Sequence, residues 1–258
     1  MSQVWFFALV ASSPLVLGAV GGLRLRLPER ILAGMLSFAA GALITAVAYE
    51  LFEDSYAQGG IWRAGLGMLA GAAVFTALSA MLDRWAEAPG TDEEGSPKLD
   101  KDAAATDKSP AAASAHGAAG LALLAAVTLD GVPENVALGV SLTEGTGGLA
   151  LLAAIFASNL PEAFVGSASM REQGRSSGYI IGTWSSAAAL LTLAVVVGAG
   201  PLAVASPETI SLPLAFAAGA VLASLADTLM PEAYEQGGPL VALSTTAGFV
   251  LSFILATL

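Results

Sequence analysis

Long apolar segments constrain the fold of this chain more than any other feature. A helix needs about 20 apolar residues to cross a hydrocarbon core of roughly 30 Å. Eight segments meet this requirement, at residues 4–23, 31–51, 61–82, 118–140, 147–170, 179–197, 212–230 and 240–258. Because lipid offers no hydrogen-bond partners to the backbone, each segment is expected to be helical. The sequence therefore predicts an all-α integral membrane protein with eight transmembrane helices.

The composition agrees with a lipid environment and excludes several classes of protein. Only 12% of the residues are charged, against about 25% in soluble domains. The 29 glycines suit helices that associate through small-residue interfaces. The chain has no Cys, which excludes disulfides and thiolate metal sites. The sequence also has no basic patch that would suit a nucleic acid. Because most of the chain is apolar, membrane lipid is the partner that we expect to surround it.

Basic residues are distributed unevenly among the predicted connections. Three lie between the first and second segments, four between the third and fourth, and two between the fifth and sixth, whereas Arg63 stands alone on the other side. Because basic residues accumulate in cytoplasmic connections, we expect a multi-pass protein of the cell membrane with both termini external. The polar stretch 86–117 is expected to be a mobile cytoplasmic loop, since it lacks the apolar residues needed to form a core.

An internal repeat sets the predicted organisation of the helices. Residues 38–60 read FAAGALITAVAYELFEDSYAQGG and residues 216–238 read FAAGAVLASLADTLMPEAYEQGG, with eleven identities and no gap. The second predicted helix therefore corresponds to the seventh, an odd number of crossings later, so the two copies should be inverted. Inverted repeats are typical of secondary transporters.

The repeat predicts a division into four parts in a 3+2+3 arrangement. Residues 1–85 hold helices 1–3, and residues 171–258 hold helices 6–8 as the inverted copy. The loop 86–117 precedes residues 118–170, which hold helices 4 and 5.

Three carboxylates lie near the middle of the two central spans. Asp130 and Glu134 are four residues apart on one helical face, and Glu162 lies in the next span. A carboxylate at the bilayer centre costs about 2.5–3.5 kcal/mol on insertion scales. A bound cation would offset that cost, because no Lys or Arg lies within the two central spans.

Oxygen atoms beside these carboxylates complete a predicted metal site. Ser158 and Asn159 lie one turn before Glu162, and Pro133 and Pro161 each free the carbonyl oxygen four residues earlier. An all-oxygen set of this kind suits a hard or borderline divalent cation. Protonated carboxylates acting as packing contacts, a proton relay without metal, a cation channel and a non-transporting membrane protein remain alternatives. The chain has no HExxH motif and no Cys, so its sequence does not indicate an enzyme of those classes.

The motifs LDGVPEN at 129–135 and SNLPEA at 158–163, with the eight-helix plan, resemble the ZIP (Zrt/Irt-like) metal transporters, in a divergent prokaryotic-type form. The resemblance implies alternating access, in which helices 1, 4, 5 and 6 carry a divalent metal substrate past helices 2, 3, 7 and 8. Zinc, manganese, iron, cobalt and cadmium are the expected substrates, without any organic cofactor, and a homodimer is left open.

Position by position, the resemblance assigns metal ligands and shows departures from the family. Asp130 stands where the family motif HNxPEG has its His, Glu134 and Glu162 are the shared acids, and Ser158 and Asn159 occupy the polar pair of helix 5. The Asn of that motif is replaced by Gly here, and its Gly by Asn. Further acids either line the two entrances or are solvated, namely Glu50, Glu53, Asp54, Asp227 and Glu232.

The topology can be tested by cysteine labelling, because the chain has no native Cys. A Cys placed at Ser96 should be protected from an impermeant maleimide in intact cells and become reactive after permeabilisation. A Cys placed at Ser2 should be labelled from outside. Labelling at position 96 in intact cells would contradict the basic-residue asymmetry as the guide to orientation.

Overall fold

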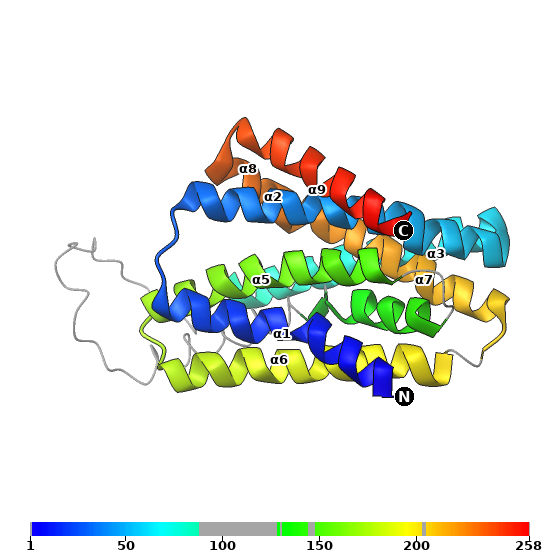
Figure 1. Ribbon diagram of the computed structural model, residues 1–258, viewed down its shortest axis with the longest axis horizontal. Coiled ribbons are helices and arrows are strands. Elements are labelled where there is room, and N and C mark those ends of the chain that lie inside the picture. Colours follow the sequence, from blue (N-terminus) through cyan, green and yellow to red (C-terminus); the bar gives the residue numbers. More distant parts are fainter. Residues whose placement is uncertain (1, 88–127, 130, 144–147, 203–204, 258) are drawn as a thin grey trace, which may run out of the picture.

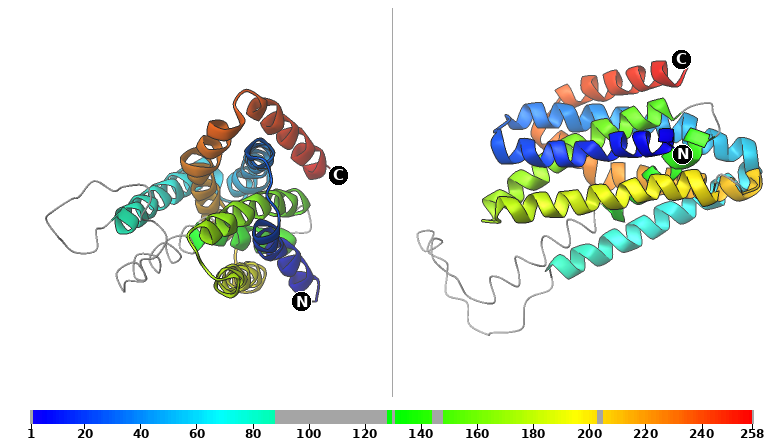
Figure 2. Two further views of the ribbon diagram at one scale, coloured as in Figure 1. Left: turned by 90° about the vertical axis from the view of Figure 1, so that its left-hand side faces the viewer. Right: turned by 60° about the horizontal axis from the view of Figure 1, so that its bottom comes forward.

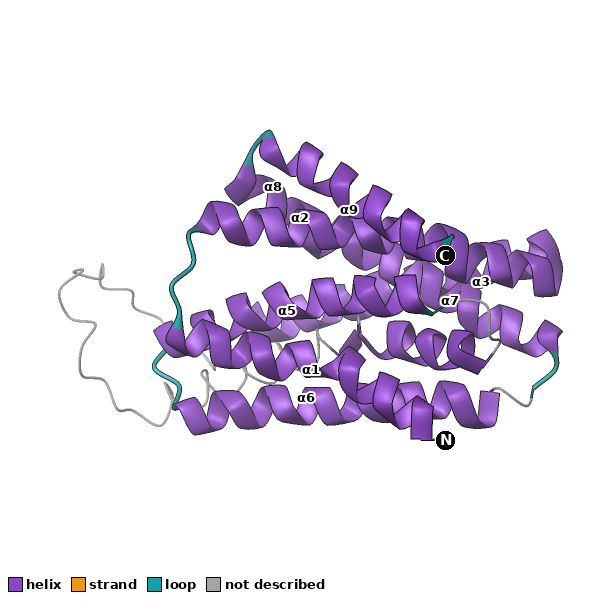
Figure 3. Ribbon diagram, in the orientation of Figure 1, coloured by secondary structure: helices purple, strands orange, loops and turns teal. Residues whose placement is uncertain are grey.

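The computed structural model describes residues 2–87, 128–129, 131–143, 148–202 and 205–257. Every regular element in these residues is helical and none is a strand (Figure 3), which confirms the predicted all-α class. Most of the predicted loop 86–117 and the ligand candidate Asp130 lie outside the described residues.

The helices run roughly along one common direction and form a bundle (Figures 1 and 2). A helix over residues 131–143 lies between α3 and α5 in the chain. The other elements are α1 Ser2–Arg24, α2 Glu29–Ala46, η1 Val47–Phe52, α3 Glu53–Glu87, α5 Leu149–Glu172, α6 Ser177–Val197, η2 Gly198–Leu202, α7 Pro207–Ser224, η3 Leu225–Leu229, α8 Met230–Gly237 and α9 Leu240–Ala256, where η denotes a π-helical segment.

Five helical stretches among the described residues are long and apolar enough to cross a membrane, which indicates a multi-pass membrane protein. One of them, Glu29–Met81, contains the predicted span 31–51 and all but the last residue of the span 61–82, on either side of a break at Gly60. The apolar helix Leu240–Ala256 is shorter. Of the predicted span 118–140, only residues 128–129 and 131–140 are described.

The helices continue beyond the apolar segments that predicted them. The helix expected to end at residue 51 runs on through η1 and ends at Gly60, where φ is 73°. Its counterpart, expected to end at residue 230, runs through η3 and α8 to Gly238, where φ is 56°. Hydropathy shows which residues are suited to lipid, but it does not show where a helix ends. A helix ends where the backbone leaves the helical region of φ and ψ. Glycine allows this at Gly60 and Gly238, because it adopts a positive φ at little cost.

The helices pack in two groups (Figures 1 and 2). In one group α1 packs against α5 and α6, and the helix 131–143 joins it through close contact with α6. In the other group α2 packs against α8 and α9, and α3 packs against α7. The contact of α2 with α5 joins the two groups.

Glycines allow the backbones of the second group to touch. A Cβ at any of four glycines would collide with a carbonyl oxygen of the neighbouring helix: Gly41 with Thr245, Gly248 with Phe38, Gly219 with Met68, and Gly71 with Phe216. Gly41 and Gly219 occupy equivalent positions of the sequence repeat. The crossing of α2 with α9 and the crossing of α3 with α7 are therefore built in the same way.

The two copies of the repeat share two further local features. The π-helical segments η1 and η3 begin at equivalent positions, and so do the helix breaks at Gly60 and Gly238. In Figure 1 the turn between α8 and α9 lies at the left end of the bundle, while the chain that leaves α2 runs to the right end before it turns. Equivalent turns thus lie at opposite ends, as expected for oppositely oriented copies.

The glycine contacts predict a clear difference between two alanine substitutions. Gly219→Ala should destabilise the protein by about 1–3 kcal/mol, because the new methyl group overlaps the Met68 carbonyl oxygen. Gly65→Ala is the matched control in α3, since a Cβ there has no neighbour within 4 Å. It should leave stability level or raise it by up to about 1 kcal/mol. Thermal unfolding in detergent measures both; equal midpoints for the two variants would argue against a tight α3–α7 crossing.

Candidate functional site

The helix 131–143 and α5 form the centre of the first group. They are consecutive, and residues of both, including Leu138 and Ile155, belong to one buried apolar cluster. Glu134 lies nine residues before the end of its helix at residue 143, and Ser158 lies nine residues after Leu149 begins α5. Because both helices rise 1.5 Å per residue from the same connection, Glu134 and Ser158 lie at about the same depth in the bundle.

The polar residues at this depth are buried. The exposed fraction is 3% for Glu134, 2% for Ser158 and 3% for Asn159, and Asn135 is fully buried. Glu162, one turn further along α5, is half-buried. The structure therefore buries three of the five predicted ligands, leaves Glu162 half-buried, and does not describe Asp130.

Two buried amides in this cluster have atoms that lack a hydrogen-bond partner among the described residues. The amide nitrogen of Asn135 donates to the Gly131 carbonyl oxygen at 2.8 Å, which leaves Asn135 Oδ1 without a partner. Asn159 Nδ2 is likewise buried without one. Exchanging the amide nitrogen and oxygen of Asn159 would place an oxygen at that position. An unsatisfied buried polar atom costs about 1–3 kcal/mol, so the cluster has unused capacity to bind a ligand.

Pro161 adds a backbone oxygen to the same region. It lies inside α5, which continues without interruption from Leu149 to Glu172. Proline has no N–H, so the Ala157 carbonyl lacks its usual helical donor. The Ser158 hydroxyl donates to the Ile155 carbonyl oxygen at 3.1 Å, and its lone pairs remain available as acceptors.

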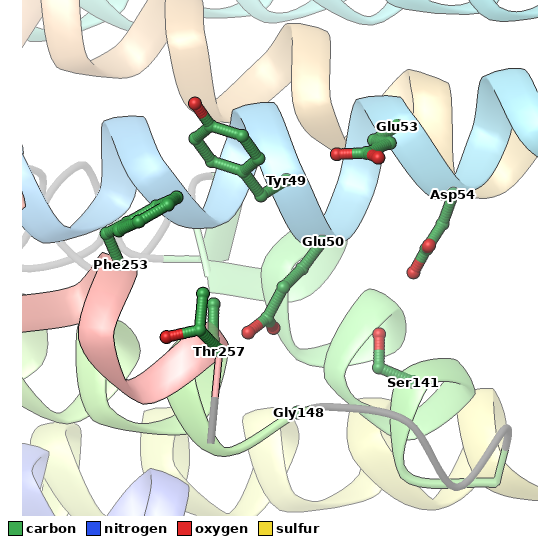
Figure 4. Close-up of a pocket in the computed structure, with 9 residues that line it drawn as sticks. Tyr49, Glu50, Glu53, Asp54, Ser141, Gly148, Phe253 and Thr257 are labelled. Atoms are coloured by element: carbon green, nitrogen blue, oxygen red, sulfur yellow. The ribbon is translucent and has the colours of Figure 1, made fainter.

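A separate pocket of about 260 Å³ lies where η1 and the start of α3 meet the start of α5 and the end of α9 (Figure 4). Its polar lining consists of Tyr49, Glu50, Glu53, Asp54, Ser141 and Thr257. From the sequence, the three acids either line an entrance or are solvated, and the structure brings them into one pocket. Ser141 and Thr257 could not be identified from the sequence, because an isolated hydroxyl residue in or beside an apolar helix does not by itself indicate a binding site.

The acids of the second repeat copy do not join this pocket. Asp227 is exposed, and its carboxylate accepts a hydrogen bond from the Ser79 hydroxyl at 2.8 Å. Glu232 is half-buried in α8. Although the backbone is duplicated, the polar side chains that it carries are therefore different.

The described part of the site contains two carboxylates, two amides and one hydroxyl. Within the described residues no group of three or more His, Cys, Asp or Glu side chains could hold a metal ion. The third predicted carboxylate of the site, Asp130, is outside that search. No protein-family model matches this sequence, and no curated protein matches it.

Proposed function

We propose that this protein transports a divalent metal cation across the membrane through the site that helix 131–143 and α5 form. The burial of Glu134 at the depth of Ser158 and Asn159, inside a bundle of apolar helices, carries the proposal. Ionisable groups in such positions are costly, and they mark substrate and ion pathways and proton relays in membrane proteins. Reversible binding of a cation would explain why these polar side chains lie inside the membrane-spanning bundle.

Charge and donor type favour a metal cation over an organic substrate. The chain has no Lys or Arg between Lys108 and Arg171, the part that holds the site. Carboxylate, amide, hydroxyl and backbone oxygens are the ligands that hard and borderline divalent cations prefer. The one His of the sequence, His116, lies outside both helices, so we propose manganese or iron as substrates alongside zinc, cobalt and cadmium.

The proposal includes a place in the ZIP family, with eight helices in a 3+2+3 arrangement and external termini. The packing of α1, α5, α6 and helix 131–143 as one group and of α2, α3, α7 and α9 as another supports it. The start of α1 and the end of α9 also lie toward the same end of the bundle (Figure 1).

The internal symmetry of the first group also supports a transporter. A Cβ at Gly22 of α1 would collide with the Phe164 carbonyl oxygen of α5, and a Cβ at Gly198 would collide with the Val136 carbonyl oxygen. Phe164 and Val136 are each three residues after the proline of their motif. The two motif helices are thus held in the same way by α1 and by the chain that continues α6, as in carriers that rock one unit against another.

Glu134 and Glu162 are the residues that we expect to be indispensable for metal transport. Glu134→Gln and Glu162→Gln preserve shape and remove one charge each, so the fold should persist. Losing a charged ligand costs about 3 kcal/mol, which is a factor of about 100 in affinity. Uptake of Mn²⁺ and Zn²⁺ into proteoliposomes should therefore be lost at micromolar metal. Thermal stability without metal should stay level or rise, since a buried charge has been removed.

Glu235→Gln is the control for these variants, because it removes a charge from an exposed position in α8. It should transport metal like the wild type. Wild-type uptake in both Glu134→Gln and Glu162→Gln would reject the site and favour carboxylates that act as packing contacts. Uptake that never saturates with metal concentration would favour a channel instead.

Metal preference should respond to the residue at position 130. Asp130→His adds an imidazole, which suits zinc better than manganese. Zinc affinity should therefore rise relative to manganese affinity, measured by competition in the uptake assay. Asp130→Asn is the control that removes the charge without adding an imidazole. Unchanged relative affinities in Asp130→His would mean that position 130 does not supply a ligand.

A further inference from the structure

Glu50 is one of the residues that line the pocket in Figure 4. It lies in the π-helical segment η1, and its exposed fraction is 6%. Its Oε2 accepts a hydrogen bond from the Leu151 backbone N–H at 3.0 Å, in the first turn of α5. The residue before α5 is Gly148, which has no side chain to cap that helix. Glu50 therefore supplies a cap from a different helix, and this cap joins the two packing groups.

The second oxygen of the Glu50 carboxylate does not take part in this cap. Glu50 Oε1 is buried and has no hydrogen-bond partner among the described residues. The hydroxyl of Ser141, which is 4% exposed and lines the same pocket, is in the same condition. Two buried oxygens from different helices thus face one cavity with unsatisfied lone pairs. Buried polar atoms normally have a hydrogen-bond partner, so two such oxygens without one indicate that a ligand binds between them.

The rest of the lining has the same chemical character. Glu53 is exposed and adds a second carboxylate, and the Thr257 hydroxyl donates to the Ile254 carbonyl oxygen at 2.9 Å, so its lone pairs are free to accept. None of the described residues that line the pocket is a Lys or an Arg. Its volume of about 260 Å³ is several times the ~30 Å³ share of one water molecule. A cation could therefore bind here with part of its hydration shell.

We propose that this pocket is a second binding site, for a partly hydrated hard divalent cation, with Glu50 Oε1 as its direct protein ligand. Glu53 and Ser141 complete the site directly or through water. The inference rests on the proposed function only in treating the site as a station on the path to Glu134. The site stands on its own as a place where a cation binds.

The position of the pocket explains what a second site would contribute. Leu151, which Glu50 caps, lies seven residues before Ser158 in α5, or about 10 Å along the helix. The pocket lies toward the end of the bundle where α9 ends, the end that the basic-residue asymmetry predicts to be external. A cation held there would be concentrated at the mouth of the path. The Glu50 carboxylate would then contact both the bound cation and α5, the helix that carries Ser158 and Asn159.

Binding of Mn²⁺ to the purified full-length protein, counted by loss of the free-ion EPR signal, tests this site. In a Glu134→Gln/Glu162→Gln background about one Mn²⁺ per chain should remain bound. Adding Glu50→Gln should weaken that binding by about tenfold or more, the loss expected for one charged ligand. Its amide oxygen can still accept from Leu151 N–H, so the cap on α5 is retained. Glu53→Gln should weaken binding less, and Glu235→Gln should not change it.

If the double variant does not fold, the same count is made in the wild-type background. There Glu50→Gln should reduce bound Mn²⁺ from about two ions per chain to about one, with an unchanged thermal midpoint in metal-free buffer. No ion left in the double variant, or a remaining ion that Glu50→Gln does not affect, would overturn the second site. Metal transport and its dependence on Glu134 would be untouched by that result. A Glu50-dependent ion in a protein that transports no metal would support the pocket and reject the proposed function.

Discussion

The contact of glycine backbone with a neighbouring carbonyl oxygen sets the distances between helices in this protein. Inside a bilayer, apolar side chains gain little by leaving lipid, so helices associate through close packing. At Gly41 and Gly219 even one methyl group would not fit. These crossings fix α2 against α9 and α3 against α7 and so produce a firm second group.

The elements that could be predicted are those on which lipid acts directly. Apolar length predicted where helices lie, and the repeat predicted that the second helix corresponds to the seventh. The structure adds that the breaks at Gly60 and Gly238 correspond as well. Helix ends could not be placed, because residues such as Glu53 and Asp54 are compatible with a helix although they suit water better than lipid. The π-helical segments also gave no sequence signal, since they depend on packing that only the folded bundle supplies.

The candidate site was predictable where the chain itself brings residues together. Glu134 and Asn159 come from adjacent helices joined by a short connection, so spacing alone placed them at similar depths. The pocket at Glu50 combines η1, the end of helix 131–143, the start of α5 and the end of α9. No local pattern links Ser141 or Thr257 to Glu50, because their proximity depends on how the two groups pack. Sequence reasoning could therefore propose the acids and could not complete the lining.

The π-helical turn at Glu50 connects the frame to the site. A π turn adds a residue to the helix and is frequent where function requires a side chain to be re-aimed. In η1 the Glu53 N–H donates to the Ala48 carbonyl oxygen, five residues earlier, rather than to the usual partner four residues earlier. Glu50 lies inside this turn and contacts the first turn of α5. The equivalent position of the second copy carries Thr228, whose hydroxyl donates to the Ser224 carbonyl oxygen of the same helical stretch. The duplicated frame thus provides the same π-helical geometry twice, and only the first copy uses it to place a carboxylate between the two groups.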